Sequence, residues 1–311
     1  MQLDGSLSWL ALALTPGLAS RLSARVLRRF DSPDGVFRAT LPDLESCHLP
    51  AQVAKAIVKK ESFKRAEKEL TGVQKIAGCY LLNWTEPEYP QTLLQIYDPP
   101  VLLYVRGDPQ VLNLPSLSIV GTRRPTLYGT QMAHRLGRHL AARGLVIVSG
   151  MARGIDAIGH QGAMDANGRA IGVLGTGIDV CYPKENKKLY EKVLERGAIV
   201  SEFPLRTHPA PENFPIRNRI VAGMPLGVVV VEGHGVRQRS IRRAGERYAA
   251  REFRAEPTHQ AGREARHLRR GRDRRAAHAH PCRAGAGRKA GDRAAESIGS
   301  CRAEWHGEKA L

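Results

Sequence analysis

The sequence predicts an α/β protein with a doubly wound parallel sheet, and three observations carry this prediction. Short apolar runs typical of buried strands alternate with helical patterns between residues 117 and 231. Glycine-containing turns follow three of these runs. The flanking regions differ in pattern, because the first is helical and the last is rich in arginine. We therefore divide the chain into a helical domain (residues 1–70), a connecting segment (71–116), a sheet domain (117–233) and a basic tail (234–311).

The helical domain is predicted to begin with two helices, Leu7 to Leu14 and Leu18 to Phe30, joined by a turn at Gly17. A second turn is expected at residues 32–35, and a third helix, basic on its polar side, at residues 51–70. The pattern resembles a small SAM-like or helix-hairpin-helix domain. In one interpretation the free backbone N–H groups of the hairpin hold a DNA phosphate, and in the other the domain is a packing module.

The sheet domain follows a connecting segment that is rich in proline and holds one predicted strand, Val101 to Val105. Five strands are then predicted at residues 117–120, 145–149, 170–174, 198–201 and 226–231. Helices are predicted between them at residues 128–143, 155–166, 184–196 and 214–224. Five strands joined by four helical crossovers form a Rossmann-like doubly wound parallel sheet.

The chain is strongly basic, with 48 Lys and Arg against 30 Asp and Glu and a formal net charge of +18. Such a charge favours an acidic partner, of which nucleic acid is the commonest. The charge is uneven, because residues 1–233 carry +7 and residues 234–311 carry +11. The tail has too few apolar residues to bury a core, so we expect it to be disordered.

Ligands of a doubly wound sheet bind beyond the carboxyl ends of its strands, where glycine loops and helix N-termini favour anions. The basic residues at this edge are spread over several loops, as a groove that follows a polyanionic backbone requires, and one aromatic residue there is suited to stacking on a base. The predicted DNA-binding residues are Gly121, Arg123, Arg124, Gly150, Arg153, Gly154, Lys184, Lys187, Lys188, Phe214, Arg217, Asn218 and Arg219. In the alternative interpretation the lysines form a solvated helix face, while Arg217 and Arg219 hold local carboxylates or carbonyls.

Several other functions are disfavoured by the same loops. The turn after the first strand lacks the G-x-G-x-x-G spacing of dinucleotide sites, and the second strand ends in Ser149-Gly150, where an acidic ribose ligand is expected. No G-x-x-x-x-G-K-[ST] run of nucleotide triphosphatases is present. We interpret Asp156 and His160, four residues apart, as packing or capping groups, and Glu202 and Glu232 as residues that orient arginines. We therefore predict no cofactor, no metal and no catalytic residue.

The five cysteines show no short paired spacing, which is typical of reduced thiols in a cytoplasmic protein. The apolar run from Leu7 to Leu14 is too short to span a bilayer, and no basic residue precedes it as in a signal peptide. We therefore expect a cytoplasmic protein without a membrane partner.

Several loop sequences resemble the bacterial DNA-processing protein A family, known as DprA or Smf. The resemblance is carried by YPQTLLQIYDPPVLLYVRGD (Tyr89 to Asp108), SIVGTRRPTLYG (Ser118 to Gly129), VSGMARGIDAIGHQGA (Val148 to Ala163), GTGIDVCYPKENKKLY (Gly175 to Tyr190), IVSEFP (Ile199 to Pro204) and FPIRNRIVAG (Phe214 to Gly223). These motifs follow the family's order over residues 75–233.

The resemblance implies a non-enzymatic protein that binds single-stranded DNA taken up during natural transformation, in the competent cell. Such a protein protects the DNA, helps to load the RecA recombinase for DNA recombination, and is usually a homodimer. The family's DNA pocket would fall on Gly121, Arg123, the lysines of the YPKENKK run, and Phe214 with Arg217 and Asn218. The alternative function is a Rossmann-like nucleotide-binding enzyme of the phosphoribohydrolase type, although the Pro-Gly-Gly-x-Gly-Thr run of those enzymes is absent.

The resemblance ends at Gly233, where family members continue into a Ser-Gly-Ser-Leu-Ile-Thr type segment that this chain lacks. The tail has the composition that a GC-rich gene yields when it is translated out of frame. A frameshift product and a genuine Arg-rich nucleic-acid-binding arm are the two interpretations. A frameshift would leave the strand at residues 226–231 with an exposed edge and place dimerisation in doubt.

Overall fold

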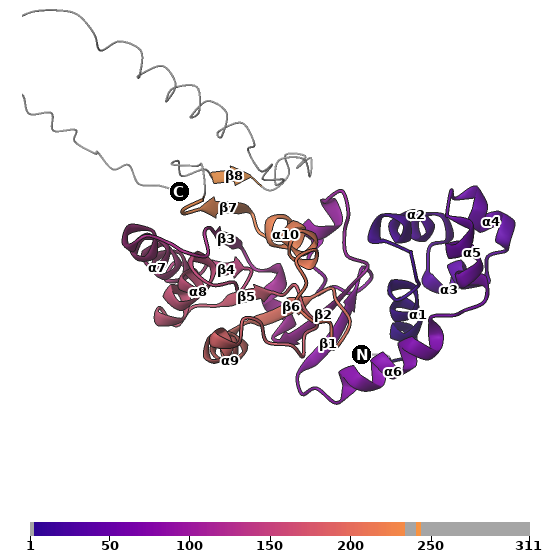
Figure 1. Cartoon of the computed structure of the whole chain (residues 1–311), viewed down its shortest axis with the longest axis horizontal. Helices are drawn as coiled ribbons and strands as arrows, with labels where there is room; N and C mark the ends of the chain where they lie inside the picture. Colours follow the sequence, from indigo (N-terminus) through magenta and orange to yellow (C-terminus); the bar gives the residue numbers. More distant parts are fainter. Residues whose placement is uncertain (1–2, 234–240, 244–311) are drawn as a thin grey trace, which may run out of the picture. The chain divides into compact units, whose positions relative to one another are not determined.

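The computed structural model describes residues 3–233 and 241–243, which form an eight-stranded mixed sheet with helices on both faces (Figure 1). The strand order is β1-β2-β6-β5-β4-β3-β7-β8. The strands are β1 (Cys79–Asn83), β2 (Leu102–Gly107), β3 (Ser116–Val120), β4 (Val146–Ser149), β5 (Ala170–Val173), β6 (Ala198–Ser201), β7 (Gly227–Val230) and β8 (Ile241–Arg243). The five predicted strands are β3 to β7, and their pairs are all parallel, which confirms the predicted Rossmann-like sheet.

The winding of the chain places the helices. Helices α7 (Leu127–Ala141), α8 (Ile155–Asp165) and α9 (Lys187–Arg196) carry the chain stepwise from β3 to β6, and α10 (Asn213–Gly223) returns it to β7 on the other side of β3. Right-handed crossovers in opposite directions put α10 on the face opposite α7 to α9 (Figure 1). The two neighbouring strands that reverse the winding, β3 and β7, therefore mark the switch point where such sheets bind ligands.

The apolar core follows from the alternation of side chains along the strands. Ile147 of β4 packs against residues of α7 and α8, whereas its neighbours Val146 and Val148 pack with Ile220 and Val221 of α10. The central strands are buried on both faces, so their sequences are continuous apolar runs.

The connecting segment contributes to the same sheet. The sequence predicted one strand there, and the structure has two, because β1 pairs antiparallel with β2, which pairs antiparallel with β6. The short apolar run of β1 lies in the proline-rich connecting segment, outside the alternation of strands and helices that predicted the sheet. Two short 3-10 helices, η1 (Gln91–Gln95) and η2 (Pro109–Asn113), bury Leu93 and Val111 in the core beneath α10.

The helical domain has more helices than the sequence predicted: α1 (Leu3–Ala13), α2 (Ser20–Phe30), α3 (Pro33–Arg38), α4 (Leu41–Ser46), α5 (Ala51–Val58) and α6 (Phe63–Gln74). The turn predicted at residues 32–35 is the start of α3, because the Ser32 hydroxyl accepts the Gly35 N–H at 3.1 Å and Pro33 takes the first helical position. The single helix predicted at residues 51–70 is interrupted where Lys60 adopts a left-handed φ of 54°.

The turn between α1 and α2 packs within the helical domain. Gly17 has a φ of 74°, and a Cβ there would lie 3.0 Å from the side chain of Val53. The Thr15 hydroxyl donates to Ala11 O at 2.9 Å and lies 3.3 Å from the Ser62 hydroxyl. These contacts suit the packing interpretation, while a role of the turn in DNA binding stays a prediction.

Residues 241–243 of the tail form β8, which pairs antiparallel with β7. The edge of β7, which a frameshift was expected to expose, is therefore paired along Gly227 to Val229. The other tail residues lie outside the described part of the chain. Within the described part, no helix is long and apolar enough to cross a membrane.

Three cysteines of the described residues, Cys47, Cys79 and Cys181, are free thiols. Burial raises the pKa of the Cys79 thiol to about 11. Because the thiolate is the reactive form, this side chain is a packing group rather than a nucleophile.

Candidate nucleic-acid interface

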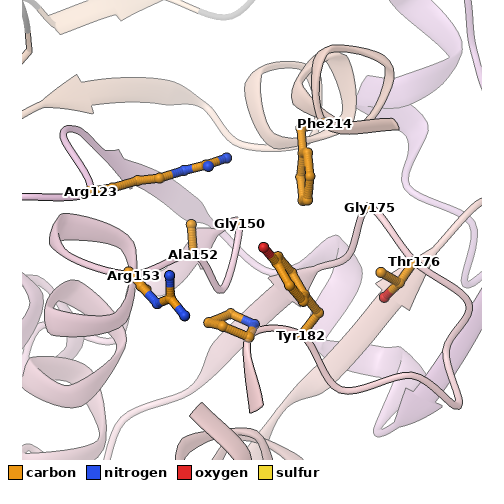
Figure 2. Close-up of a pocket in the computed structure, with 9 residues that line it drawn as sticks. Arg123, Gly150, Ala152, Arg153, Gly175, Thr176, Tyr182 and Phe214 are labelled. Atoms are coloured by element: carbon orange, nitrogen blue, oxygen red, sulfur yellow. The ribbon is translucent and has the colours of Figure 1, made fainter. Parts of the chain in front are cut away.

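A small pocket lies where the sheet presents the carboxyl ends of β3, β4 and β5 (Figure 2). Its lining comes from the loops after these strands and from the start of α10, and consists of Arg123, Gly150, Ala152, Arg153, Gly175, Thr176, Tyr182, Pro183 and Phe214. The space open to water is about 30 Å³, room for one or two water molecules. A nucleoside therefore cannot be enclosed, and a ligand enters only in part.

The loops at this edge pack so closely that glycine is required at several positions. Gly154 has a φ of 76°, and a Cβ there would lie 2.3 Å from Thr122 O. A Cβ on Gly121 would lie 2.6 Å from Glu232 O, which also accepts the Thr122 N–H at 2.7 Å. The backbone of three loops is thus brought together at the switch point. Direct contacts of Gly121, Gly150 and Gly154 with DNA stay predictions.

An aromatic and cationic cluster forms the mouth of the pocket. The guanidinium of Arg123 lies 5.3 Å from the centroid of the Phe214 ring. The ring centroids of Tyr182 and Phe214 are 5.8 Å apart, and the two ring planes form an angle of 38°. Figure 2 shows Arg123, Phe214 and Tyr182 converging on the pocket. Tyr182, which is 37% exposed, was missed by the sequence reasoning, although an aromatic residue beside a lysine run was a usable signal.

The second exposed arginine of the pocket, Arg153, is paired with Glu185 of η3 (Lys184–Asn186). Both side chains are 60% exposed, so water screens the pair and its contribution to stability is small. The neighbouring Asn186 amide donates to Met151 O at 2.8 Å and ties η3 to the loop after β4. A phosphate can therefore replace Glu185 at low cost while the loops stay in place.

The remaining predicted contacts at this edge are exposed: Arg124, Lys184, Lys187, Lys188 and Asn218. Exposure is compatible with DNA binding and with a solvated helix face, so the role of each stays a prediction.

Arg217, predicted among the DNA contacts, lies in the interior. It is 4% exposed, and its Nη1 donates to Val173 O at 2.6 Å. Burial lowers its pKa, and the nearby carboxylate of Asp156 acts in the opposite direction. Its charge is therefore engaged within the fold, as the alternative interpretation of local carbonyl binding expected.

Arg219 is likewise engaged within the fold and does not line the pocket. It donates to Asp98 O at 2.6 Å, lies 3.7 Å from the Asp98 carboxylate and forms an ion pair with Glu202. Burial raises the pKa of Glu202 to about 7, and the charge of Arg219 opposes that shift. This confirms that Glu202 orients an arginine, while a DNA contact of Arg219 stays a prediction.

The other acidic residue expected to orient an arginine, Glu232, has a different role. Its carboxylate accepts the N–H of Thr126 at 3.0 Å and the hydroxyl of Thr126 at 3.1 Å. Thr126 is the N-cap of α7, so Glu232 ties the end of β7 to the start of that helix.

The buried pair on α8 behaves as packing and capping groups, as predicted. Asp156 accepts the Gly150 N–H at 3.1 Å, and His160 Nε2 lies 3.2 Å from Ile171 O. Burial lowers the pKa of His160 to about 4, so its ring is neutral at pH 7. Among residues 3–233 and 241–243, no three His, Cys, Asp or Glu side chains gather to hold a metal ion.

The fold and site together define a Rossmann-like protein with a basic and aromatic edge in place of a dinucleotide cradle. A sequence profile of the DNA recombination-mediator protein A family matches residues 80–240. The DNA processing protein DprA of Bacillus subtilis (strain 168) is 35% identical over 215 residues, which are 68% of this chain and 72% of that protein. The chain therefore belongs to the DNA recombination-mediator protein A family, as its motifs indicated.

Two further proteins are similar to this chain, one in sequence and one in fold. Protein Smf of Escherichia coli (strain K12) is 43% identical over 145 residues, which are 46% of this chain and 39% of that protein. The X-ray structure of DprA from Streptococcus pneumoniae superposes with a TM-score of 0.61 at 30% identity, over 74% of this chain and 77% of that chain. The chain thus spans most of some relatives and less than half of others.

Proposed function

We propose that this protein binds single-stranded DNA at the carboxyl edge of its sheet and acts in DNA processing without performing chemistry. The observation that carries the proposal is the cluster of Arg123, Phe214 and Tyr182 beside Arg153. Separated cations follow a phosphate backbone, and aromatic rings stack on unpaired bases. The relatives named as DNA processing proteins support the same class of ligand.

Single strands fit this edge better than duplex DNA does. Stacking on Phe214 or Tyr182 requires a base face that is free, and in a duplex these faces are covered by neighbouring bases. The ligand in this account is an extended strand that lies across the loops after β3, β4 and β5.

The cellular role that accompanies this binding is the one that the family resemblance implies. The protein would protect incoming single-stranded DNA during natural transformation and help to load RecA recombinase, as a homodimer in the cytoplasm.

The alternative, a phosphoribohydrolase-type enzyme, requires an acid that projects into the site. Of the described residues that line the pocket, none carries a carboxylate. Glu202 is held by Arg219, and Glu232 is held by Thr126. The binding function is therefore better supported than the enzymatic one.

The test is the binding of the full chain to fluorescent oligo-dT at several salt concentrations. Each phosphate contact on a single strand contributes about 0.7 to the slope of log K against log salt. Arg123→Gln should lower the affinity and reduce the slope by about that amount. The matched control is Arg143→Gln, an exposed arginine just beyond the opposite end of α7. Equal behaviour of the two variants would contradict the proposal, even if the basic tail gives strong binding.

A further inference from the structure

We infer that Arg217 and Asn213 are positioning residues of the proposed DNA site and do not contact DNA themselves. They fix α10 to the carboxyl end of β5 and thereby place Phe214 at the pocket. This inference rests on the proposed function and deepens it, because it separates the residues that touch the ligand from those that hold them in place.

Two side chains attach α10 to the end of β5. The Asn213 amide donates to Gly175 O at 3.1 Å, and Arg217 Nη1 donates to Val173 O at 2.6 Å. Residues four apart share one face of a helix, so both donors reach the same strand end from the first two turns of α10. Phe214 follows Asn213 directly, and its ring lies so close that a Cβ on Gly175 would be 3.0 Å from Phe214 Cδ1.

Arg217 also contacts the loop after β4. A Cβ on Gly150 would lie 1.8 Å from Arg217 Nη1, so the loop passes directly over the guanidinium. The Gly150 N–H donates in turn to Asp156, whose charge acts on Arg217. Arg217 thus supports the loop that carries Arg153 as well as the helix that carries Phe214.

The burial of Arg217 separates it from a phosphate at the pocket surface. Its Nη1 is engaged, and its Nε, which has no partner among the described residues, is buried as well. Moving the guanidinium outward would leave Asp156 buried without its counter-charge, which is strongly unfavourable. Arg123, in contrast, can move to a phosphate, because it is exposed and lies over Phe214.

The salt dependence of oligo-dT binding separates contact from positioning. Arg217→Gln should lower the affinity about tenfold, as expected for the loss of one stacked base, with the slope of the wild-type chain. Arg123→Gln should reduce the slope by about 0.7. In a Phe214→Ala background, Arg217→Gln should cost little further affinity, because the ring that it positions is gone. A slope reduced by about 0.7 in Arg217→Gln, or a full loss on top of Phe214→Ala, would overturn the inference.

Arginine modification by phenylglyoxal, mapped by mass spectrometry on the wild-type chain, decides the matter if Arg217→Gln does not fold. Arg123 should react in the free protein and be protected by oligo-dT, whereas Arg217 should stay unmodified in both states. Reaction of Arg217 in the free protein would refute the inference. A wild-type chain that does not bind oligo-dT would refute the proposed function instead, and the footprint of the free protein would still decide whether Arg217 is a buried support.

Discussion

The arginines near the carboxyl edge of the sheet fall into two groups, one exposed at the pocket and one held inside the fold. Arg123 and Arg153 are exposed at the pocket, whereas Arg217 and Arg219 of α10 are held by groups of the fold itself. All four lie near the carboxyl ends of parallel strands, so their position in the sequence does not distinguish them. The difference is set by whether the guanidinium is buried among carbonyls and carboxylates of the fold or lies in water.

The two kinds of arginine also differ in what their ion pairs contribute. The pair of Arg153 with Glu185 is well exposed, so its partner can be exchanged at little cost. The pair of Arg219 with Glu202 is 18% and 10% exposed, so removing one partner leaves a buried charge. Substitutions should therefore affect DNA affinity at the pocket and stability along α10.

The largest effect is expected for Arg219→Met. It leaves the carboxylate of Glu202 buried without its partner and removes the hydrogen bond to Asp98 O, and should lower the free energy of unfolding by about 3 kcal/mol. Urea unfolding of the full chain measures this change. Arg143→Gln is the control and should change stability by less than about 0.5 kcal/mol. If both variants unfold alike, Arg219 does not belong to the stabilising group.

Next in size is the effect of Phe214→Ala on binding. Loss of one stacked base should reduce the affinity for oligo-dT by about 1 to 3 kcal/mol, with the salt slope unchanged because no charge is removed. Phe214→Trp keeps a stacking surface and should retain most of the affinity. Equal affinities of the alanine variant and the wild-type chain would show that the ring is not a stacking platform.

A smaller effect concerns the pH dependence of stability. The pKa of Glu202 is raised to about 7, so its carboxyl binds a proton more tightly in the folded chain and stabilises the fold as the pH falls. The pKa of His160 is lowered to about 4. Below about pH 6.5 this histidine is therefore protonated in the unfolded chain but not in the folded chain, which destabilises the fold as the pH falls.

Glu202→Gln removes the first of these opposing contributions. The variant should therefore lose more stability than the wild-type chain between about pH 7 and pH 5, by up to roughly 2 kcal/mol. Urea midpoints at the two pH values measure the difference, with the exposed Glu195→Gln as the control. Parallel pH profiles of the wild-type chain and Glu202→Gln would contradict the assignment.

The smallest effect is expected for Glu185→Gln. This change releases Arg153 from an exposed ion pair and should strengthen oligo-dT binding a few-fold, since such a pair is worth less than about 1 kcal/mol. The salt slope should change little, because Arg153 contacts a phosphate in both chains once Glu185 is displaced. Glu195→Gln on α9 controls for the change in net charge, and an equal gain in that variant would assign the effect to net charge alone.

Much of the fold could be predicted from the sequence because it depends on local patterns. The parallel strands β3 to β7 are short, mainly apolar runs separated by helices, and their order along the chain fixes most of the topology. The strand β1 and the break at Lys60 lack such patterns, since tertiary pairing and a single left-handed residue create them. They became visible only in the structure.

The sequence predicted where the candidate site lies, but not every residue that forms it. Glycine loops and charges located the edge of the sheet, and Arg123, Arg153 and Phe214 do line the pocket. The burial of Arg217 depends on Val173 O and Asp156, which are distant in sequence, so residue type alone did not reveal it. Tyr182 reaches the pocket because η3 is tied to the loop after β4, which is also a tertiary effect.

Photo-crosslinking tests the central claim, that DNA binds at the aromatic mouth of the pocket, most directly. An oligonucleotide carrying 5-iododeoxyuridine would be irradiated with the full chain, and the crosslinked peptides would be identified by mass spectrometry. The account predicts crosslinks at Tyr182 and Phe214 that are lost when unlabelled oligo-dT competes. Crosslinks confined to the helical domain or to residues 234–311 would contradict it.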